Sequence, residues 1–344
     1  MDIVNSWHLV ETLVPGQMTV ISTGGKVRDW TKIDRLSPGP EFDLHGFLEL
    51  TRSSCAEQDV IFKGRRREAR IRAVPVLGPS GETHGIQVWV GDPEVEPDPV
   101  RIVSGIAWLL ERTVIEQTVE ASAMSGVSAA DHVPERTPAE YNAKAVKFDG
   151  SEELFAQALV PTHGQKWEGP MSVLHADGRI MRWHCWGRGR TDPPNVGLRL
   201  LWHDVTDTTE PDKPTLAELG MPSGLESGGT RIAVFDGRTG ILTMWLPEAP
   251  TWVKWRDLTS GCGVLHDDDR ATLSDALEKW THDTSPVSAD VRVRAIDGGD
   301  ATGWKWQQTR LELRPYPGQL GDRLVLAVLP ALQPSEQVLE VPTP

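Results

Sequence analysis

Apolar and polar residues alternate along this chain in short stretches separated by glycine turns, a pattern typical of antiparallel strands. Residues 70–90 form one such unit, with a turn at Gly78-Pro79-Ser80-Gly81. Residues 171–183 form a second unit around Asp177-Gly178, and residues 291–306 form a third. We therefore expect an antiparallel sheet in each third of the chain.

The first and third regions also begin with a predicted hairpin. Residues 18–22 and 27–30 flank the sequence Thr23-Gly24-Gly25-Lys26, and adjacent glycines at that spacing favour a tight turn. Residues 230–235 and 241–245 flank a similar glycine-containing turn. The middle region has no recognisable opening hairpin, so we expect it to be the shortest of the three.

Two stretches have the spacing of apolar residues that predicts an amphipathic helix. The longer one covers residues 100–124 and follows Pro99, a residue that is tolerated in the first turn of a helix. The shorter one covers residues 270–280. The longer helix exceeds what one small domain needs for packing, so we expect it to link domains or to form a homodimer contact.

The length and two linkers predict three domains. The chain has 344 residues, which is too many for one ordinary hydrophobic core. Stretches rich in small polar residues, Pro and Gly occur at 125–138 and 211–229 and are typical of linkers. The three predicted domains are residues 1–124, 138–210 and 229–330.

Composition and charge narrow the expected surroundings and partners. The net charge is -14, which disfavours association with nucleic acid or an anionic membrane. There are 3 cysteines and no Cys-x-x-Cys motif, a usage that fits a reducing cytoplasm. The N-terminus lacks the features of a signal peptide, and no apolar run reaches the length of a membrane span. We therefore expect a cytoplasmic protein.

Several motifs in the third region resemble a PAS domain. Residues 234–242 (Val-Phe-Asp-Gly-Arg-Thr-Gly-Ile-Leu) look like the opening hairpin, and residues 266–270 (His-Asp-Asp-Asp-Arg) look like the start of the following helix. Residues 292–298 look like the charged strand and the Asp-Gly turn. In the middle region, Asp204-Val-Thr-Asp207 resembles the end of such a domain, and residues 69–120 resemble the end of a GAF or PAS domain.

The whole chain is similar to the mycobacterial triple sensor-domain proteins with a PAS-GAF-PAS-type arrangement. This resemblance implies an α+β fold of three tandem PAS/GAF-like domains, each an antiparallel sheet with helices packed on one face. It also implies sensing, dimerisation or scaffolding in signal transduction, with a small ligand or a signalling protein as partner. The three regions and their linkers account for the chain, so we expect no attached output domain.

The sequence contains no motif for a catalytic nucleophile, a phosphate-binding loop or a zinc protease, so we expect no enzymatic activity and no required cofactor. A ligand, if present, would lie between sheet and helices among apolar and aromatic side chains. The chain has 14 tryptophans, and most are expected to fill cores. The pocket candidates in the third domain are Phe235, Trp245, Trp252, Trp255 and Trp306.

The alternative function is a haem- or metal-binding sensor centred on the middle domain. Imidazole and thiolate groups suit zinc and haem iron, and the middle region contains His175, His184, Cys185 and His203. His184 and Cys185 are adjacent, so a strand would turn them to opposite faces. At most one of these two side chains is expected to share a site with His175 or His203.

Overall fold

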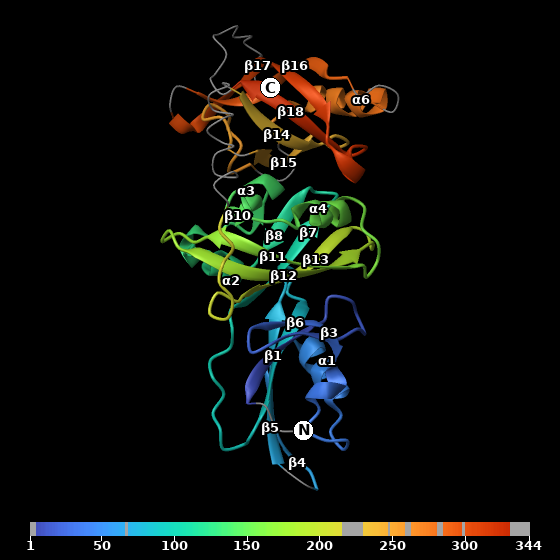
Figure 1. Cartoon of the computed structure of the whole chain (residues 1–344), viewed down its shortest axis with the longest axis vertical. Coiled ribbons are helices and arrows are strands. Elements are labelled where there is room, and N and C mark those ends of the chain that lie inside the picture. The colour runs from blue at the N-terminus through green and yellow to red at the C-terminus, as the bar shows by residue number, and fades with distance from the viewer. Residues whose placement is uncertain are drawn as a thin grey trace. The chain divides into compact units, whose positions relative to one another are not determined.

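Three antiparallel sheets and a small number of short helices make up the described part of the chain (Figure 1). A computed structural model describes residues 5–65, 68–214, 230–246, 248–258, 263–280, 285–297 and 300–330. The chain divides into two compact units. Unit 1 comprises residues 1–111, 115–135 and 145–213, and unit 2 comprises residues 112–114, 136–144 and 214–344.

The first sheet has six strands in the order β3-β2-β1-β6-β5-β4. Its strands are β1 (Ser6–Glu11), β2 (Thr19–Thr23), β3 (Lys26–Lys32), β4 (Gln58–Lys63), β5 (Glu68–Leu77) and β6 (Thr83–Gly91). The predicted hairpin is confirmed as β2 and β3, joined through Gly24 and Gly25, whose φ angles of 54° and 80° favour glycine.

Helix α1 (Leu44–Ser54) covers one face of the first sheet. The helix begins at Asp43, whose side chain accepts a hydrogen bond from the Gly46 amide and so satisfies a free N–H group at the helix start. Leu48 from the helix packs with Ile71 and Ile86 from the sheet, and all three side chains are fully buried. A short 3-10 helix, η1 (Ile33–Leu36), precedes α1.

The second sheet has seven strands in the order β10-β11-β12-β13-β7-β8-β9. Its strands are β7 (Val103–Leu109), β8 (Val114–Gln117), β9 (Glu135–Arg136), β10 (Ala145–Lys147), β11 (Lys166–Leu174), β12 (Ile180–Arg190) and β13 (Gly197–Asp204). The helical segments along this part of the chain are α2 (Val119–Met124), η2 (Ala129–Asp131), α3 (Pro138–Asn142) and α4 (Ser151–Leu159). Phe155 of α4 packs edge-on against Trp108 of β7, with ring centroids 5.2 Å apart.

The predicted long helix at residues 100–124 is wrong. This stretch forms the hairpin β7–β8, and only its last residues are helical, as α2. All seven residues of β7 are buried, because the strand is covered on both faces. The sequence of a strand that is buried on both faces does not alternate between apolar and polar residues, so its pattern cannot be distinguished from that of a buried helix. This hairpin opens the second sheet, so the expectation that the middle region lacks an opening hairpin is also wrong.

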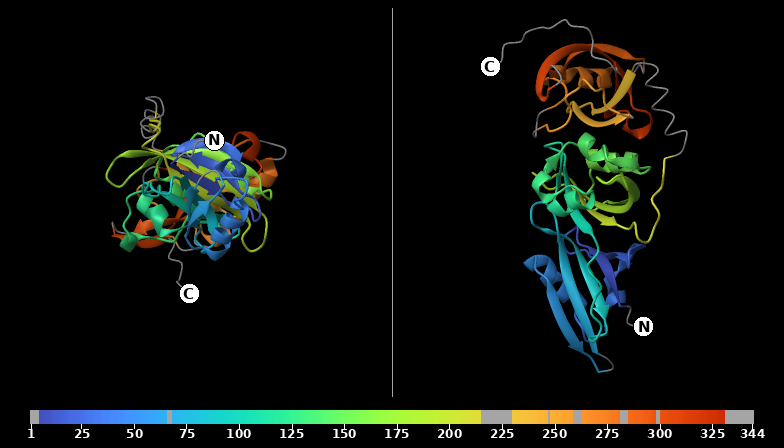
Figure 2. Two further views of the ribbon diagram at one scale, coloured as in Figure 1. Left: turned by 90° about the horizontal axis from the view of Figure 1, so that it is seen from below. Right: turned by 90° about the vertical axis from the view of Figure 1, so that its left-hand side faces the viewer.

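The third sheet, gold to red in Figures 1 and 2, has five strands in the order β15-β14-β18-β17-β16. Its strands are β14 (Thr230–Asp236), β15 (Ile241–Leu246), β16 (Val287–Asp297), β17 (Asp300–Pro315) and β18 (Leu324–Pro330). The helical segments are η3 (Asp267–Asp269), α6 (Ala271–Trp280) and η4 (Gly318–Leu320). The predicted hairpin at 230–245 and the predicted helix at 270–280 are both confirmed.

The three sheets share one connectivity. In each sheet the opening strand pairs with the closing strand, as β1 with β6, β7 with β13, and β14 with β18. Outward from the opening strand the next strands follow in chain order, and outward from the closing strand they follow in reverse chain order. The repeated pattern that the sequence indicates is therefore a repeat of a whole sheet.

Candidate functional site

Within unit 1, the first two sheets meet at a buried junction. One apolar cluster takes side chains from both sheets, and its buried members are Leu9, Leu13, Ile21, Val76, Val103, Trp186 and Leu201. Gly105 of β7 approaches the end of β5 so closely that a Cβ atom there would lie 2.4 Å from the Leu77 carbonyl oxygen. The junction thus depends on backbone contact as well as on apolar packing.

A buried ion pair crosses the junction. Nη2 of Arg188, on β12, lies 2.6 Å from Oε1 of Glu11, at the end of β1. The same carboxylate accepts hydrogen bonds from the Thr19 hydroxyl (2.8 Å) and the Leu13 amide (3.1 Å). Arg188 also donates to the Gly164 carbonyl at 2.9 Å. Both charges are therefore compensated by several partners, which a buried pair requires.

The ring of Trp30, on β3 of the first sheet, packs against the guanidinium of Arg188. The Arg188 guanidinium carbon lies 4.5 Å from the centroid of the Trp30 ring, and Lys166 Nζ lies 4.8 Å from it. Trp30 has a φ of 36°, an uncommon angle for a residue with a side chain. Cation–π attraction between these groups adds to the stability of the junction.

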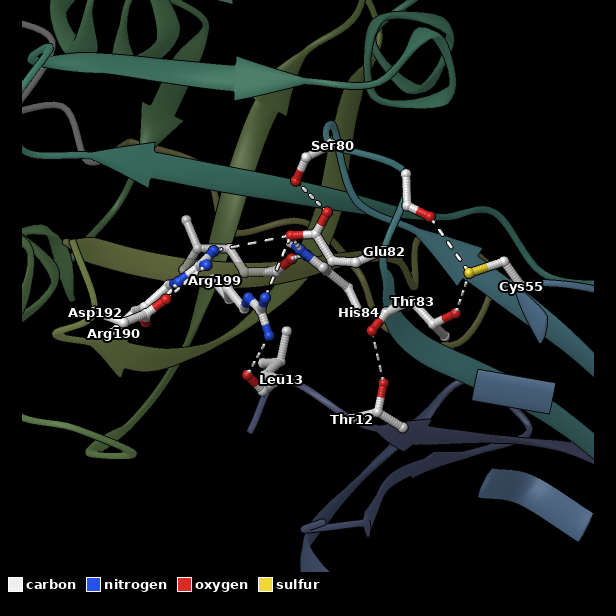
Figure 3. A network of polar contacts seen from close by, with 12 residues as sticks. Thr12, Leu13, Cys55, Ser80, Glu82, Thr83, His84, Arg190, Asp192 and Arg199 are labelled. Atoms are coloured by element: carbon white, nitrogen blue, oxygen red, sulfur yellow. Dashed lines mark hydrogen bonds and ion pairs between the residues drawn. The ribbon is translucent and has the colours of Figure 1, made fainter. Parts of the chain in front are cut away.

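A second polar network surrounds His84 at the start of β6 (Figure 3). The fully buried His84 ring places Nδ1 3.0 Å from the Leu200 carbonyl and Nε2 3.3 Å from Glu82 Oε1. Each ring nitrogen thus has an oxygen acceptor within hydrogen-bond distance. Oε1 of Glu82 also lies 3.5 Å from Nη2 of Arg199 and 4.0 Å from Nη1 of Arg190.

Hydrogen bonds and burial shift the pKa values of two groups in this network in the same direction. The hydrogen bond from His84 lowers the pKa of the Glu82 carboxyl well below its usual range. Burial lowers the pKa of Arg199, which donates to the Leu13 carbonyl at 3.3 Å. Arg190 binds the Asp192 carboxylate through two hydrogen bonds of 2.8 Å. The network thus ties together loops from both sheets.

The structure brings together two of the four residues predicted as metal-ligand candidates. His184 and His203 are cross-strand partners on β12 and β13. Cys185 points to the other face, where burial raises the pKa of its thiol well above the usual value. His175 lies in the turn before β12, with Nδ1 2.8 Å from Asp177. Among the described residues there is no cluster of three or more His, Cys, Asp or Glu side chains suited to a metal ion.

The hydrogen bonds of His203 disfavour metal binding at this ring. Arg101 Nε donates to His203 Nε2 at 2.9 Å, so the ring proton is on Nδ1 and that nitrogen has no lone pair for a metal. Burial, together with the nearby Arg101, lowers the pKa of His203 to about 3. Burial and Arg182 similarly lower the pKa of His184 to about 4. Both rings are therefore neutral at physiological pH.

The five predicted pocket residues do not share one location. Phe235, Trp245 and Trp252 are buried in the core of unit 2, and Trp255 packs at the edge of that core. The ring centroids of Trp245 and Trp255 are 6.3 Å apart. Trp306 lies outside this core cluster, with its ring centroid 4.9 Å from that of His266.

A groove of about 1110 Å³ lies elsewhere in unit 2, between α6 and the segment before β18. Its walls include Leu277 and Trp280 from the helix and Pro315 and Tyr316 from the opposite side. None of the five predicted residues lines it. The described part of the chain contains no helix long and apolar enough to cross a membrane.

Residues 6–99 match the family described as Rv3651-like, N-terminal, and this match spans the first sheet. The fold of the whole chain is similar to that of an uncharacterized protein from Mycobacterium tuberculosis. The TM-score is 0.76 at 21% sequence identity, with 96% of this chain and 97% of that chain covered. The likeness shows a shared fold and agrees with the mycobacterial part of the resemblance. No curated protein sequence matches this chain.

Two sensory proteins give weaker structural matches. A sensory box histidine kinase/response regulator from Burkholderia thailandensis has a TM-score of 0.26 at 14% identity, covering 37% of this chain and 90% of that chain. An RNA-binding light-oxygen-voltage receptor has a TM-score of 0.25 at 11% identity, covering 66% and 95% respectively. Scores this low carry no argument about function.

Sequence reasoning missed the residues that join the two sheets. Glu11 and Arg188 are 177 positions apart, and neither belongs to a recognisable motif. The only sequence signal is a polar residue inside a predicted apolar stretch, such as His84 just before a run of strand residues. Such a signal indicates a buried polar group and cannot identify its partner.

Proposed function

We propose that this chain is a non-enzymatic cytoplasmic sensory or scaffold protein of signal transduction, built from three PAS/GAF-like domains and acting through a partner protein. The observation that carries the proposal is the filling of the space between sheet and helix. In unit 2, Phe235, Leu265 and Leu273 are fully buried in one continuous cluster. Side chains thus occupy the place where a domain of this type would hold a ligand, which favours scaffolding over ligand sensing.

The repeated connectivity of the three sheets supports the PAS/GAF-like description. In each sheet the first and last strands in the chain pair with each other in the interior of the sheet. A helix packs on the first sheet and another on the third. The cross-sheet ion pair and the His84 network join the first two domains within unit 1. A partner would therefore meet a surface composed of two domains. A small molecule, where one binds, would enter the groove beside α6.

Affinity capture from a cell lysate tests the proposal, with small molecules released from the same purified protein measured by mass spectrometry. We expect a specific protein to be retained and no small molecule at a stoichiometric level. A matched control is the chain carrying Glu11→Gln, which should weaken unit 1 and reduce capture by any surface that needs both sheets. A stoichiometric ligand, or turnover of a substrate, would contradict the scaffold role.

A further inference from the structure

Unit 2 carries an aromatic and cationic patch on the outer face of its sheet. In β16, Val293 and Ala295 belong to the core, so Arg294 between them points to the opposite face. Arg294 pairs across the ladder with Trp306, and Ile296 pairs with Trp304. The patch consists of Trp304, Trp306, Arg294 and His266, and none of these residues belongs to the buried core cluster.

The rings of the patch are held in a fixed arrangement. The Arg294 guanidinium carbon lies 4.0 Å from the Trp304 centroid and 5.2 Å from the Trp306 centroid. The two indoles meet edge-to-face at 5.2 Å, and His266 packs against Trp306. A surface whose side chains are already ordered loses little conformational entropy when a partner binds.

Trp304 is more exposed than the buried tryptophans of unit 2. This indole is 42% exposed, whereas Trp252 and Trp280 of the same unit are 5% and 7% exposed. Those buried rings donate their N–H groups to the Pro330 and Ser285 carbonyls. Trp304 instead leaves a large apolar surface in water, a feature that often marks an interaction site.

The positive charge of Arg294 in the patch lacks a carboxylate partner among the described residues. The neighbouring Arg292 is neutralised by Asp269 at 2.8 Å and Asp268 at 3.0 Å. Across the described residues, no carboxylate lies within ion-pair distance of Arg294. The guanidinium that stacks on Trp304 is therefore an uncompensated positive charge on a chain whose net charge is -14.

We propose that this patch docks an acidic segment of a partner protein, an inference that rests on the proposed scaffold function and names its contact surface. A carboxylate from the segment would form a charge-assisted pair with Arg294, and a proline or aromatic side chain beside it would cover Trp304. Trp and Arg are the residue types that most often dominate protein interfaces. The net charge of the chain disfavours a nucleic acid as the occupant.

A peptide array tests the surface directly, with the full chain as the soluble probe and random, acidic and basic peptides on the array. We expect acidic peptides with a neighbouring proline or aromatic residue to be retained. Trp304→Ala and Arg294→Gln should each weaken the best peptide about tenfold or more. Arg294→Lys keeps the charge and should retain more affinity than Arg294→Gln, and added salt should weaken binding.

The matched control is Leu50→Ala on α1, because Leu50 is 53% exposed and lies in the other unit. It should leave peptide binding unchanged, and thermal melting of each variant should confirm an intact fold. The inference would be overturned if the Trp304→Ala variant bound the best acidic peptide as tightly as the unaltered chain does, or if the chain preferred basic peptides. It would also be overturned by Trp304-dependent binding of oligothymidylate, or by self-association in sedimentation that Trp304→Ala abolishes.

The two proposals fail separately. If the lysate partner is retained equally by the chain and by its Trp304→Ala variant, the scaffold role stands and the patch is not its contact surface. If acidic peptides bind at Trp304 but the protein proves to turn over a substrate, the surface stands and the non-enzymatic role fails.

Discussion

Arg188 and Glu11 form an ion pair of 2.6 Å across the junction of the first two sheets, with only 4% and 0% of their side chains exposed. Moving two charges out of water costs free energy, which is recovered only when hydrogen bonds satisfy the remaining donors and acceptors. Thr19 and Leu13 donate to the carboxylate and Gly164 accepts from the guanidinium, whereas the buried Arg188 Nε has no hydrogen-bond partner among the described residues. The ion pair therefore helps to fix the position of the first sheet against the second sheet.

Removing one partner of this pair should destabilise unit 1 strongly. Arg188→Met leaves the Glu11 carboxylate buried without its cation, and we expect a loss of about 3–5 kcal/mol in the free energy of unfolding. Glu11→Leu should cost a similar amount. Urea denaturation, followed by tryptophan fluorescence, measures both.

The double variant separates the ion pair from simple packing. Because Arg188→Met with Glu11→Leu leaves no buried charge, it should be more stable than either single variant. Asp192→Asn, which breaks the more exposed pair with Arg190, is the control and should cost about 1 kcal/mol or less. Additive single effects would refute a direct interaction between Arg188 and Glu11.

The stability of unit 1 should decrease in mild acid. Burial lowers the pKa values of His8 and His184 to about 4 and that of His203 to about 3. An unfolded histidine takes up its proton near pH 6.5, so below that pH the unfolded chain binds protons that the folded chain excludes. Each ring should then reduce the free energy of unfolding by about 1.4 kcal/mol per pH unit.

Urea titrations at several pH values between neutrality and pH 4 measure this slope. His203→Gln retains an acceptor for Arg101 and should reduce the slope by the contribution of one proton. His163→Gln, at an exposed position, should leave the slope unchanged. A stability that is independent of pH across this range would show that the rings are accessible to protons in the folded state.

Gly105→Ala should push the first two sheets apart. A Cβ atom at this position would lie 2.4 Å from the Leu77 carbonyl oxygen and 2.8 Å from the Gly78 Cα, and backbone atoms cannot yield as a flexible side chain does. We expect a loss of roughly 1–3 kcal/mol from overpacking. Gly150→Ala is the control, since its nearest neighbour would lie at 3.6 Å, and thermal melting compares the two.

Removal of metal should leave the protein unchanged. Because Arg101 occupies the lone pair of His203 Nε2, the histidine pair of the middle sheet lacks a free ligand nitrogen on this ring. Dialysis against EDTA should not shift Tm, and the purified protein should show no Soret band. Stoichiometric zinc or haem iron, lost in His184→Gln, would instead establish the haem or metal sensor.

Local sequence signals determined the hairpins and the short helix. Adjacent glycines at 24 and 25 specify a tight turn through their positive φ angles, and the spacing of Leu273 and Ala276 defines a buried helix face. These signals act over a few residues, so they can be read without knowledge of the rest of the fold.

The tertiary structure decided which stretches pair and which faces are buried. Residues 103–109 form a strand because both of their faces are covered, a condition set by distant parts of the chain. The same applies to Trp306, which was predicted to share a pocket with Phe235 and lies outside the cluster that contains Phe235, and to His184 and His203, which meet only through the register of β12 and β13.

The alternation of residues along the chain thus established by itself that three antiparallel sheets are built from repeated strand and turn units. Tertiary structure alone placed Glu11 beside Arg188 and Leu200 beside His84. Burial removes water as a competing partner, so the Glu11 carboxylate and the His84 ring take their partners from within the fold, and such a partner can come from any distance along the chain.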